Sequence, residues 1–230
     1  MPTALITGAS RGLGRALARA LADRGWTLLL DARGAEDLDR VIRDLADSTG
    51  VLGIPGDVAD PVHRTHLAEQ ASELGPVDVL VNNASTLGPS PLPRLTEADI
   101  DAFEAVLHTN VVAPLAVIQS VAPHLSPDAV VVNITSDAAV ESYEGWGLYG
   151  ASKAALDQMS AVLGVEHPDW RVYAFDPGDM RTGMQQEAFP GEDISDRPAP
   201  EEVVPAFLAL LDRRPPSGRV VGSQLGVGAP

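Results

Sequence analysis

The sequence contains no cysteine among its 230 residues. This absence excludes disulfide bonds, thiol catalysis and zinc sites with cysteine ligands, and it fits a reducing compartment. Basic residues are also scarce, with 16 Lys and Arg against 32 Asp and Glu and a formal net charge of -16. Binding to nucleic acid needs clustered Lys and Arg that displace counterions from phosphates, so this balance argues against DNA or RNA as a partner.

Targeting and membrane-spanning segments are missing as well. The first residues do not combine a basic segment with a long apolar one, so the sequence predicts no secretory signal. We also find no run that approaches the roughly 20 apolar residues of a membrane span. These observations predict a cytoplasmic protein with no membrane partner.

The composition is that of a globular protein with a sizeable core. Apolar residues make up 45% of the chain and charged residues 21%. A chain of this length can be served by a single hydrophobic core, and no linker or internal repeat divides it. We therefore expect one domain that comprises residues 1–230.

Short apolar runs alternate with segments of helical periodicity. Strands are predicted at residues 4–7, 27–30, 51–54, 77–81, 129–134, 171–175 and 219–221. Helices are predicted between the first two strands and at residues 36–48, 61–74, 97–121, 147–166 and 200–211, with Asp60 and Thr96 as N-caps and a kink at Pro114. Residues 85–94 and 183–198 are predicted loops. The pattern indicates an α/β fold of the doubly wound Rossmann type, with a parallel sheet of about seven strands flanked by helices on both faces.

A glycine-rich turn follows the first predicted strand, with the sequence Thr7-Gly8-Ala9-Ser10-Arg11-Gly12-Leu13-Gly14. It opens the first helix, where unpaired backbone N–H groups can hold a pyrophosphate. Glycine allows positive φ and a close approach of ligand to backbone. The spacing differs from the GxGxxG of other dinucleotide folds, and TGxxxGxG at this place resembles the short-chain dehydrogenase/reductase family. That resemblance implies cofactor contacts by Gly8, Ser10, Arg11, Gly12, Leu13 and Gly14.

The end of the second strand bears on cofactor choice. When the family's pattern is aligned on Gly14, the position of its diol-binding acid is Ala32, and the position of the arginine of NADP-preferring members is Arg33. Arg11 adds a second positive charge on the same side. An arginine there can pair with the ribose phosphate, so NADP(H) is favoured. NAD(H) stays an alternative, because a shift of one residue would bring Asp31 to the ribose.

Three further segments match elements of the family. Asp57-Val58 corresponds to the place where the adenine ring is held. Asn82-Asn83-Ala84-Ser85 corresponds to the NNAG element, with Ser85 in place of glycine. Asp176-Pro177-Gly178-Asp179-Met180-Arg181-Thr182 resembles the segment beside the nicotinamide, with Asp176 where asparagine or serine is common. The cofactor contacts implied by the three segments are Asp57, Val58, Asn83, Ala84, Pro177, Gly178 and Thr182.

The catalytic pattern is Tyr149-Gly150-Ala151-Ser152-Lys153, preceded by Ser136 at the end of the fifth strand. Tyr149 and Lys153 share one face of a helix, so the ammonium is expected to lower the tyrosine pKa toward working pH. The resemblance implies that Tyr149 is the acid and base, that Lys153 also grips the cofactor ribose, and that Ser136 bonds the substrate oxygen. Asn110 matches the family's asparagine, which holds a water in a proton relay.

The resemblance implies an NADP(H)-dependent oxidoreductase that transfers a hydride between nicotinamide and a small carbonyl or secondary alcohol, a ketoreductase in the reducing direction. Two alternatives stay open: a regulatory or redox-sensing protein that binds NADP without turnover, and a nucleotide-sugar epimerase or dehydratase, for which little chain remains after Thr182.

Candidates for the substrate pocket are Tyr143, Trp146, Met180, Met184 and Phe189, and Glu141 and Glu144 face either this pocket or solvent. His63 and His66 are expected to be surface residues rather than metal ligands, and no metal is predicted. By analogy we expect a homodimer or homotetramer, formed through helices 97–121 and 147–166.

Overall fold

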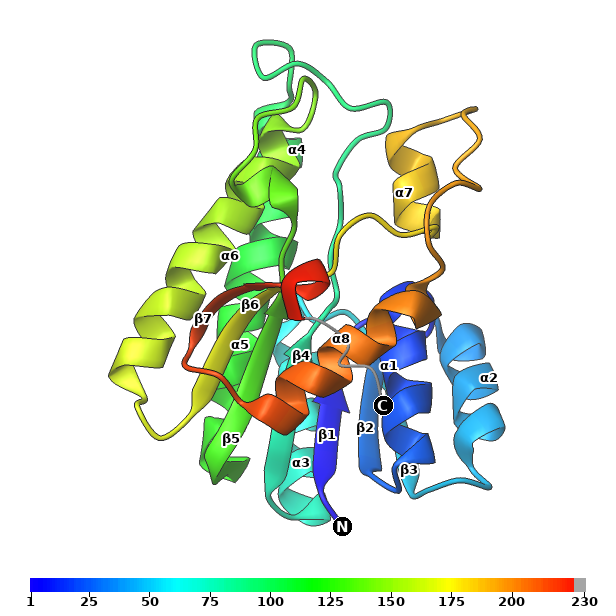
Figure 1. Cartoon of the computed structure of the whole chain (residues 1–230), viewed down its shortest axis with the longest axis vertical. Coiled ribbons are helices and arrows are strands. Elements are labelled where there is room, and N and C mark those ends of the chain that lie inside the picture. The colour runs from blue at the N-terminus through cyan, green and yellow to red at the C-terminus, as the bar shows by residue number, and fades with distance from the viewer. Residues whose placement is uncertain (226–230) are drawn as a thin grey trace.

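One parallel sheet of seven strands forms the centre of the molecule, in the order β3-β2-β1-β4-β5-β6-β7 (Figure 1). The computed structural model describes residues 1–225, so the last five residues of the predicted 1–230 domain lie outside the described part. The strands are β1 (Thr3–Ile6), β2 (Thr27–Ala32), β3 (Val51–Pro55), β4 (Val77–Asn82), β5 (Leu125–Ile134), β6 (Arg171–Asp176) and β7 (Gly218–Val221). The predicted sheet is confirmed, including its edge strand.

Helices cover both faces of this sheet. They are α1 (Gly12–Asp23), α2 (Ala35–Leu45), α3 (Pro61–Leu74), α4 (Ile100–Leu107), α5 (Ala113–Val121), α6 (Gly147–Glu166), α7 (Gly183–Ala188) and α8 (Pro200–Arg213). Strand side chains alternate between the faces. Ile6 and Leu30 pack with α1, α2 and α8, whereas Leu5 and Leu29 pack with α3, α5 and α6. The doubly wound arrangement predicted from the sequence is therefore present.

The helix predicted at 97–121 differs from the expectation in two ways. It begins at Ile100, because the Asp99 side chain accepts a hydrogen bond from the Asp101 N–H at 2.9 Å, so the predicted cap at Thr96 was wrong. It is also interrupted by a π-helical turn, η1 (His108–Val112), which lies directly before α5. Pro114 has no N–H and cannot donate to the carbonyl of Asn110 four residues earlier, which favours an irregular turn at this point.

Two further expectations need correction. The segment 183–198, predicted as a loop, contains the short helix α7, whose N-cap is Thr182. Within the described residues, the helical stretch Ile100–His124 is long and apolar enough to cross a membrane by length and composition, so the expectation that no stretch approaches a span was wrong. Core helices pass the same test, and Val117 and Val121 of this stretch are buried in the core. The predicted cytoplasmic location stays a prediction.

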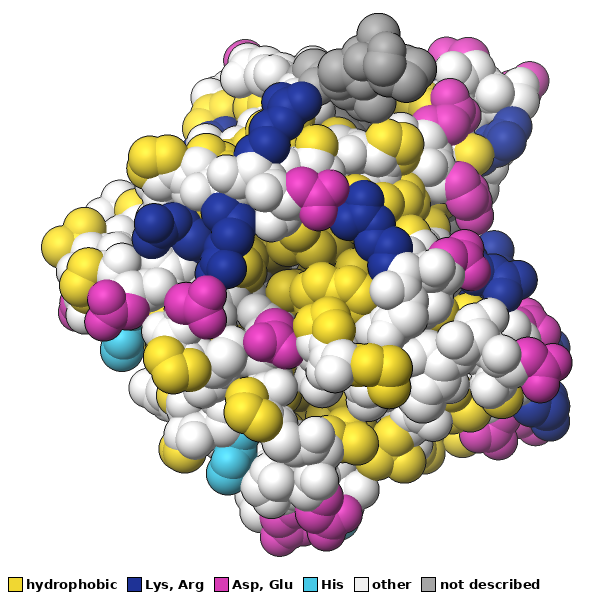
Figure 2. All heavy atoms as spheres, turned by 60° about the horizontal axis from the view of Figure 1, so that its bottom comes forward, with side chains coloured by type: hydrophobic (Ala, Val, Ile, Leu, Met, Phe, Trp, Pro, Cys, Tyr) yellow, Lys and Arg dark blue, Asp and Glu magenta, His cyan; other side chains and the backbone are white. Residues whose placement is uncertain are grey.

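Charges of both signs share the surface. On the face drawn in Figure 2, Lys and Arg side chains are interspersed with Asp and Glu around an apolar hollow, and no continuous basic stripe crosses that face. Several of the arginines are paired with acids, as Arg24 is with Asp212 at 2.9 Å and Arg214 with Asp128 at 3.0 Å. This face therefore offers no clustered basic surface to phosphates, and the absence of a nucleic-acid partner stays a prediction.

Candidate active site

A cleft of about 970 Å³ opens at the carboxyl ends of the strands. Its walls come from the turns after β1 to β6 and from the beginning of α6, α7 and α8. The strand order reverses between β1 and β4, and ligands of open α/β sheets bind at such a switch point. All the predicted cofactor-binding residues except Gly14 line this cleft.

The glycine-rich turn fits a pyrophosphate. Gly8 has φ of +66°, and a Cβ built on it would lie 2.9 Å from the Ala84 Cα atom. A Cβ on Gly14 would lie 2.4 Å from the Gly8 carbonyl oxygen, so Gly14 allows α1 to pack closely against the turn. Within residues 1–225, no side chain caps the start of α1, and its first turn contains no acid. The free N–H groups of this helix start can therefore bind an anion.

Asn83 fixes the turn to the neighbouring strand. Its Nδ2 atom donates to the carbonyl oxygens of Thr7 at 2.9 Å and Gly8 at 3.1 Å. The N–H groups of Asn83 and Ala84 both donate to the Thr7 hydroxyl, at 3.0 and 3.1 Å. The side chain of Asn83 thus holds the glycine-rich turn in place and so helps to define the shape of the cleft.

The adenosine end of the cleft contains an unexpected buried pair. The Asp31 carboxylate lies 2.5 Å from Nε2 of His63, and the two residues are only 1% and 5% exposed. The expectation that His63 is a surface histidine was wrong, because the side chain of this α3 residue turns inward beneath Gly56. Burial is the main cause that raises the pKa of Asp31, and the hydrogen bond with His63 opposes it.

The structure distinguishes Asp31 from Arg33 near the end of β2. The Asp31 side chain is engaged with His63, whereas Arg33, two residues on, is exposed, lines the cleft and forms no ion pair within residues 1–225. Asp57 and Val58 line the same end, with one Asp57 oxygen accepting the Ala59 N–H at 2.9 Å. Among residues 1–225, Arg33 is therefore a cation without an ion pair at this end of the cleft, as Arg11 is in the glycine-rich turn.

Ser136, Tyr149 and Lys153 come together at the other end of the cleft. The Lys153 Nζ atom lies 5.3 Å from the centroid of the Tyr149 ring and donates to the carbonyl oxygen of Ile134 at 2.8 Å. The Ser136 hydroxyl donates to the Asp137 carboxylate at 2.8 Å and accepts the Ala138 N–H at 3.2 Å. Ser136 also lies close enough to Tyr149 to lower the pKa of its phenol. A phenol, a hydroxyl and an amine thus share one small volume.

The electrostatics of this cluster differ from the expectation. Burial raises the pKa of Tyr149, with further increases from the Asp176 and Asp137 charges, while hydrogen bonds with Ser136 and Ser85 lower it. Burial also lowers the pKa of Lys153 to about 8, and the charge of Asp157 opposes that change. The predicted lowering of the tyrosine pKa by Lys153 is not found, because the amine bonds the Ile134 carbonyl and desolvation of the phenol dominates.

Asn110 connects the π-helical turn to the catalytic helix. It is fully buried, and its Nδ2 atom donates to the Thr86 carbonyl at 2.8 Å and the Ser152 hydroxyl at 3.0 Å. Its Oδ1 atom accepts from the Ser85 hydroxyl at 3.1 Å and the Thr86 N–H at 2.9 Å. Ser85, which replaces a glycine of the family's element, therefore has a specific place: it hydrogen bonds with Asn110 and lies close enough to Tyr149 to lower the pKa of the phenol.

The segment after β6 closes the cleft on the side of the phosphate turn. The Thr182 hydroxyl accepts the Gln185 N–H at 3.2 Å and so begins α7, while its methyl group lies next to Gly12. Pro177 and Gly178 line the cleft beside Thr182. Asp176, in contrast, is buried at the end of β6 and bonded to Arg219 of β7 at 2.7 Å.

Aromatic and apolar side chains form the substrate end. Trp146 packs edge-on against Tyr149 with ring centroids 5.7 Å apart, and Phe189 lies 6.1 Å from Trp146. All five predicted pocket residues line the cleft: Tyr143, Trp146, Met180, Met184 and Phe189. Glu144 pairs with Arg94 at 2.6 Å, and neither Glu141 nor Glu144 lines the cleft.

Three residues of the site were missed by sequence reasoning. Asp137 accepts from both Ser136 and the Tyr143 hydroxyl, the latter at 2.9 Å, and its position directly after Ser136 was the available signal. Asp179 lines the cleft mouth. Arg219 lies far along the chain from every predicted site residue, and only the pairing of β6 with β7 brings it there.

Comparisons with known proteins place this geometry in context. A family model described as short chain dehydrogenase matches residues 2–193. The short chain dehydrogenase penD of Penicillium thymicola is 37% identical over 171 residues, which cover 70% of this chain and 61% of that protein. Sepiapterin reductase of Rattus norvegicus is 35% identical over 201 residues, with 80% and 76% covered. A solved short chain dehydrogenase from Escherichia coli CFT073, complexed with NADPH, has a TM-score of 0.87 and 28% identity, and 96% of each chain is covered.

Proposed function

Because this chain belongs to the short-chain dehydrogenase/reductase family of oxidoreductases, we propose that it is an NADPH-dependent reductase of a small carbonyl compound. The observation that carries the proposal is the convergence of Ser136, Tyr149 and Lys153 at one end of a cleft whose other end is a phosphate-binding turn. An acid and a polarising hydroxyl beside a dinucleotide site are what carbonyl reduction requires.

The residues of the cleft fit NADPH. The start of α1 and the turn from Gly8 to Gly14 would hold the pyrophosphate, and Arg11 and Arg33 would pair with the phosphate on the ribose. The buried Asp31 carboxylate hydrogen bonds with His63, so the bonded oxygen would not accept a bond from a ribose diol. The NADPH complex of a relative with the same fold supports this choice. NADPH, when bound, supplies a hydride to the carbonyl carbon.

The protein's own groups would manage the oxygen and its proton. The Tyr149 hydroxyl, kept protonated by its raised pKa, is suited to donate a proton to the substrate oxygen. The Ser136 hydroxyl, next to it, would donate a hydrogen bond as negative charge develops there. Lys153, whose ammonium is poised near neutral pH, would hold the ribose and replace the proton on Tyr149. Asn110 would keep Ser85 and the catalytic helix in register.

The substrate end favours an uncharged or cationic carbonyl compound with an aromatic or other flat apolar part. Trp146 and Phe189 offer ring faces and edges, and Met184 lies beside them in the cleft. Asp137 and Asp179 contribute negative charge at the same end, which opposes anionic substrates. The similarity to sepiapterin reductase agrees with a flat, uncharged ring system.

The outer face of the helices on the α6 side supports self-association. Val112 of η1 and Val162 and Val165 of α6 are 48%, 43% and 81% exposed. Apolar side chains exposed on neighbouring helices can form a symmetric interface. We propose that the chain assembles as a homodimer or homotetramer through this face.

A carbonyl panel tests the proposed function. The purified protein is mixed with NADPH and with sepiapterin, 1-phenyl-1,2-propanedione or pyruvate, and the loss of NADPH absorbance is followed. We expect reduction of the two uncharged compounds to exceed that of pyruvate, and we expect the Tyr149→Phe variant to be inactive toward all three. A wild-type protein that binds NADPH but reduces no compound faster than Tyr149→Phe contradicts the proposal.

A further inference from the structure

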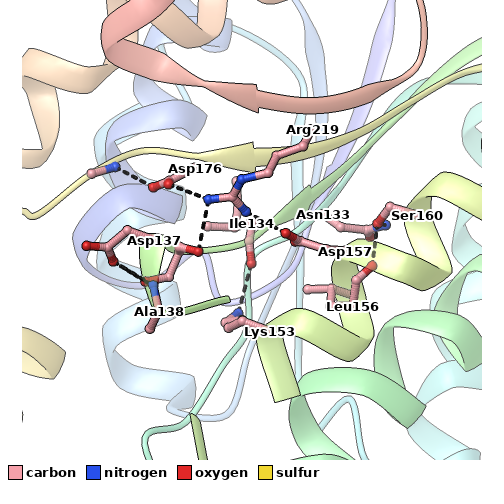
Figure 3. A network of polar contacts seen from close by, with 12 residues as sticks. Asn133, Ile134, Asp137, Ala138, Lys153, Leu156, Asp157, Ser160, Asp176 and Arg219 are labelled. Atoms are coloured by element: carbon pink, nitrogen blue, oxygen red, sulfur yellow. Dashed lines mark hydrogen bonds and ion pairs between the residues drawn. The ribbon is translucent and has the colours of Figure 1, made fainter. Parts of the chain in front are cut away.

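Asp176 introduces a buried negative charge next to the catalytic tyrosine. It ends β6 directly before Pro177, and it is 4% exposed. One carboxylate oxygen accepts the Gly178 N–H at 3.0 Å, and the other accepts from Arg219 Nη2 at 2.7 Å. Figure 3 shows the Asp176 carboxylate beside the Arg219 guanidinium. A charge in this place needs compensation, because a buried carboxylate without a partner is costly.

Arg219 reaches three elements of the active site from the edge strand β7. In addition to the bond with Asp176, its Nη1 atom lies 2.5 Å from the Asp157 carboxylate of α6 (Figure 3). Its Nη2 atom also donates to the Ser136 carbonyl oxygen at 3.1 Å. Asp157 stands one helical turn after Lys153. The guanidinium therefore joins the end of β5, the end of β6 and the catalytic helix.

The sheet register explains how this contact arises. Arg219 pairs with Ala174 of β6, and Asp176 lies two residues further along the same strand. Residues two apart on a strand face the same side, so Arg219 and Asp176 both point to the side that α6 covers. A long, forked side chain can span this diagonal and keep donors for two more acceptors.

The charges around Tyr149 show what the guanidinium does electrically. Negative charge faces the phenol from Asp176 at the end of β6 and from Asp137 in η3 (Asp137–Ala139), and positive charge comes from Lys153 of its own helix. Among the described residues, the Asp137 carboxylate is bonded only to hydroxyl groups and to the Ala138 N–H. Arg219 is therefore the cation that compensates the charge of Asp176. By pairing with Asp157, it also reduces the effect of that carboxylate on the pKa of Lys153.

We propose that Arg219 is a positioning residue of the active site, which fixes the Ser136 backbone against the catalytic helix and keeps the Asp176 and Asp157 carboxylates compensated. The inference rests on the proposed function, since it concerns the same site. It assigns a role to the edge strand, which lies beyond the residues 2–193 that the family model matches. It also explains why an aspartate can stand at the position of Asp176.

A reaction-independent measurement tests the electrostatic part. Lys153 is the only lysine in the sequence, so protein labelled with ¹³C at lysine Cε gives a single side-chain signal. In the wild type we expect this signal to titrate at about 8. In Arg219→Met, a nearby positive charge is lost and Asp157 is uncompensated, so the titration should move to higher pH; adding Asp157→Asn should move it back. Arg214→Met, which removes a surface arginine that pairs with Asp128, serves as the matched control and should leave it unchanged.

Turnover tests the positioning part. With the most active compound of the carbonyl panel, we expect Arg219→Met to lower kcat by about tenfold or more, while the Kd for NADPH changes by less than about threefold. Asp176→Asn together with Arg219→Met should recover part of kcat, because it removes the uncompensated carboxylate. Arg219→Lys keeps the charge without the fork, so it should retain intermediate activity, and it covers the case in which Arg219→Met does not fold.

The outcomes separate this inference from the proposed function. If the wild type is active, and Arg219→Met and Arg219→Lys both keep wild-type kcat with an unmoved lysine titration in Arg219→Met, the positioning role of Arg219 is overturned. If the wild type reduces nothing on the panel, the proposed function fails, and the lysine titration still decides whether Arg219 sets the electrostatics of this cluster. A titration that moves equally in Arg214→Met would also overturn the assignment.

Discussion

The Nζ atom of Lys153 lies 5.3 Å from the centroid of the Tyr149 ring, and both side chains are buried. Burial moves their pKa values in opposite directions, lowering that of Lys153 to about 8 and raising that of Tyr149. The pKa of the phenol therefore lies above that of the amine, the reverse of the order of the unperturbed groups. In this state the phenol stays a neutral acid, and the amine can gain or lose a proton near physiological pH.

Stability should depend on pH through Lys153. Below pH 8 the lysine is charged in both folded and unfolded states; between pH 8 and 10 it is neutral when folded but still charged when unfolded, where its pKa is 10.5. The unfolded state then binds more protons, so the free energy of unfolding rises with pH. Relative to Lys153→Met, we expect the wild type to gain about 2 kcal/mol from pH 8 to 10, measured by urea denaturation. Parallel pH profiles for the two proteins would show that the buried amine is not depressed.

Tyr149→Phe should remove the proton donor and leave the packing intact. General acid catalysis contributes roughly two to four orders of magnitude, so we expect kcat to fall by about that amount. The Kd for NADPH, measured by fluorescence titration, should stay within about threefold of the wild-type value, because the ring remains against Trp146. Near-normal turnover in this variant would assign the acid to another group.

Arg33→Ala should weaken NADPH selectively. The loss of a guanidinium partner for a phosphate removes a charge-assisted hydrogen bond, so kcat/KM with NADPH should fall by about tenfold or more. With NADH, which lacks that phosphate, the change should be small. Arg40→Ala is the matched control, since Arg40 lies exposed on α2 and pairs with Asp37. Equal losses with both cofactors would place Arg33 outside the ribose site.

Breaking the buried pair beneath the adenosine end should destabilise the protein. His63→Leu removes the hydrogen-bond partner of the buried Asp31 side chain, and a buried polar group left unsatisfied costs about 1–3 kcal/mol, or more if it is charged. The exposed neighbour His66 on the same helix gives the control, and His66→Leu should change the free energy of unfolding by less than about 0.5 kcal/mol. Similar small effects for both variants, measured by thermal and urea unfolding, would argue against the pair as a structural element.

Much of the fold could be predicted from the sequence because its signals are local. Nearly continuous apolar strands and the Asp60 cap follow from neighbouring residues, and the carboxylate of Asp60 accepts the Val62 N–H at 2.9 Å as expected. The start of α4 was misplaced because Thr96 and Asp99 can both cap a helix, and local sequence does not rank them when the loop before them can adopt either path.

The candidate site was predictable where residue spacing along a helix or at a strand end decides it, as for Tyr149 and Lys153. The inward turn of His63 and the reach of Arg219 could not be predicted, because both depend on which strands become neighbours. Asp31 is the last but one residue of β2 and Asp176 is the last residue of β6, and their partners come from elements that the sheet brings alongside. Likewise, the pKa values depend on burial, which spacing does not reveal.

The edge strand β7 has four residues, and each of them is only partly buried. Short edge strands with few hydrophobic contacts ordinarily define their alignment poorly, and a slip of one residue turns every side chain to the opposite face. Here such a slip would carry the guanidinium of Arg219 away from α6 and leave two carboxylates facing each other. The ion pairs of Arg219 with Asp157 and Asp176 therefore favour the observed register of this strand. A molecule with the strand misaligned would be both less stable and catalytically impaired.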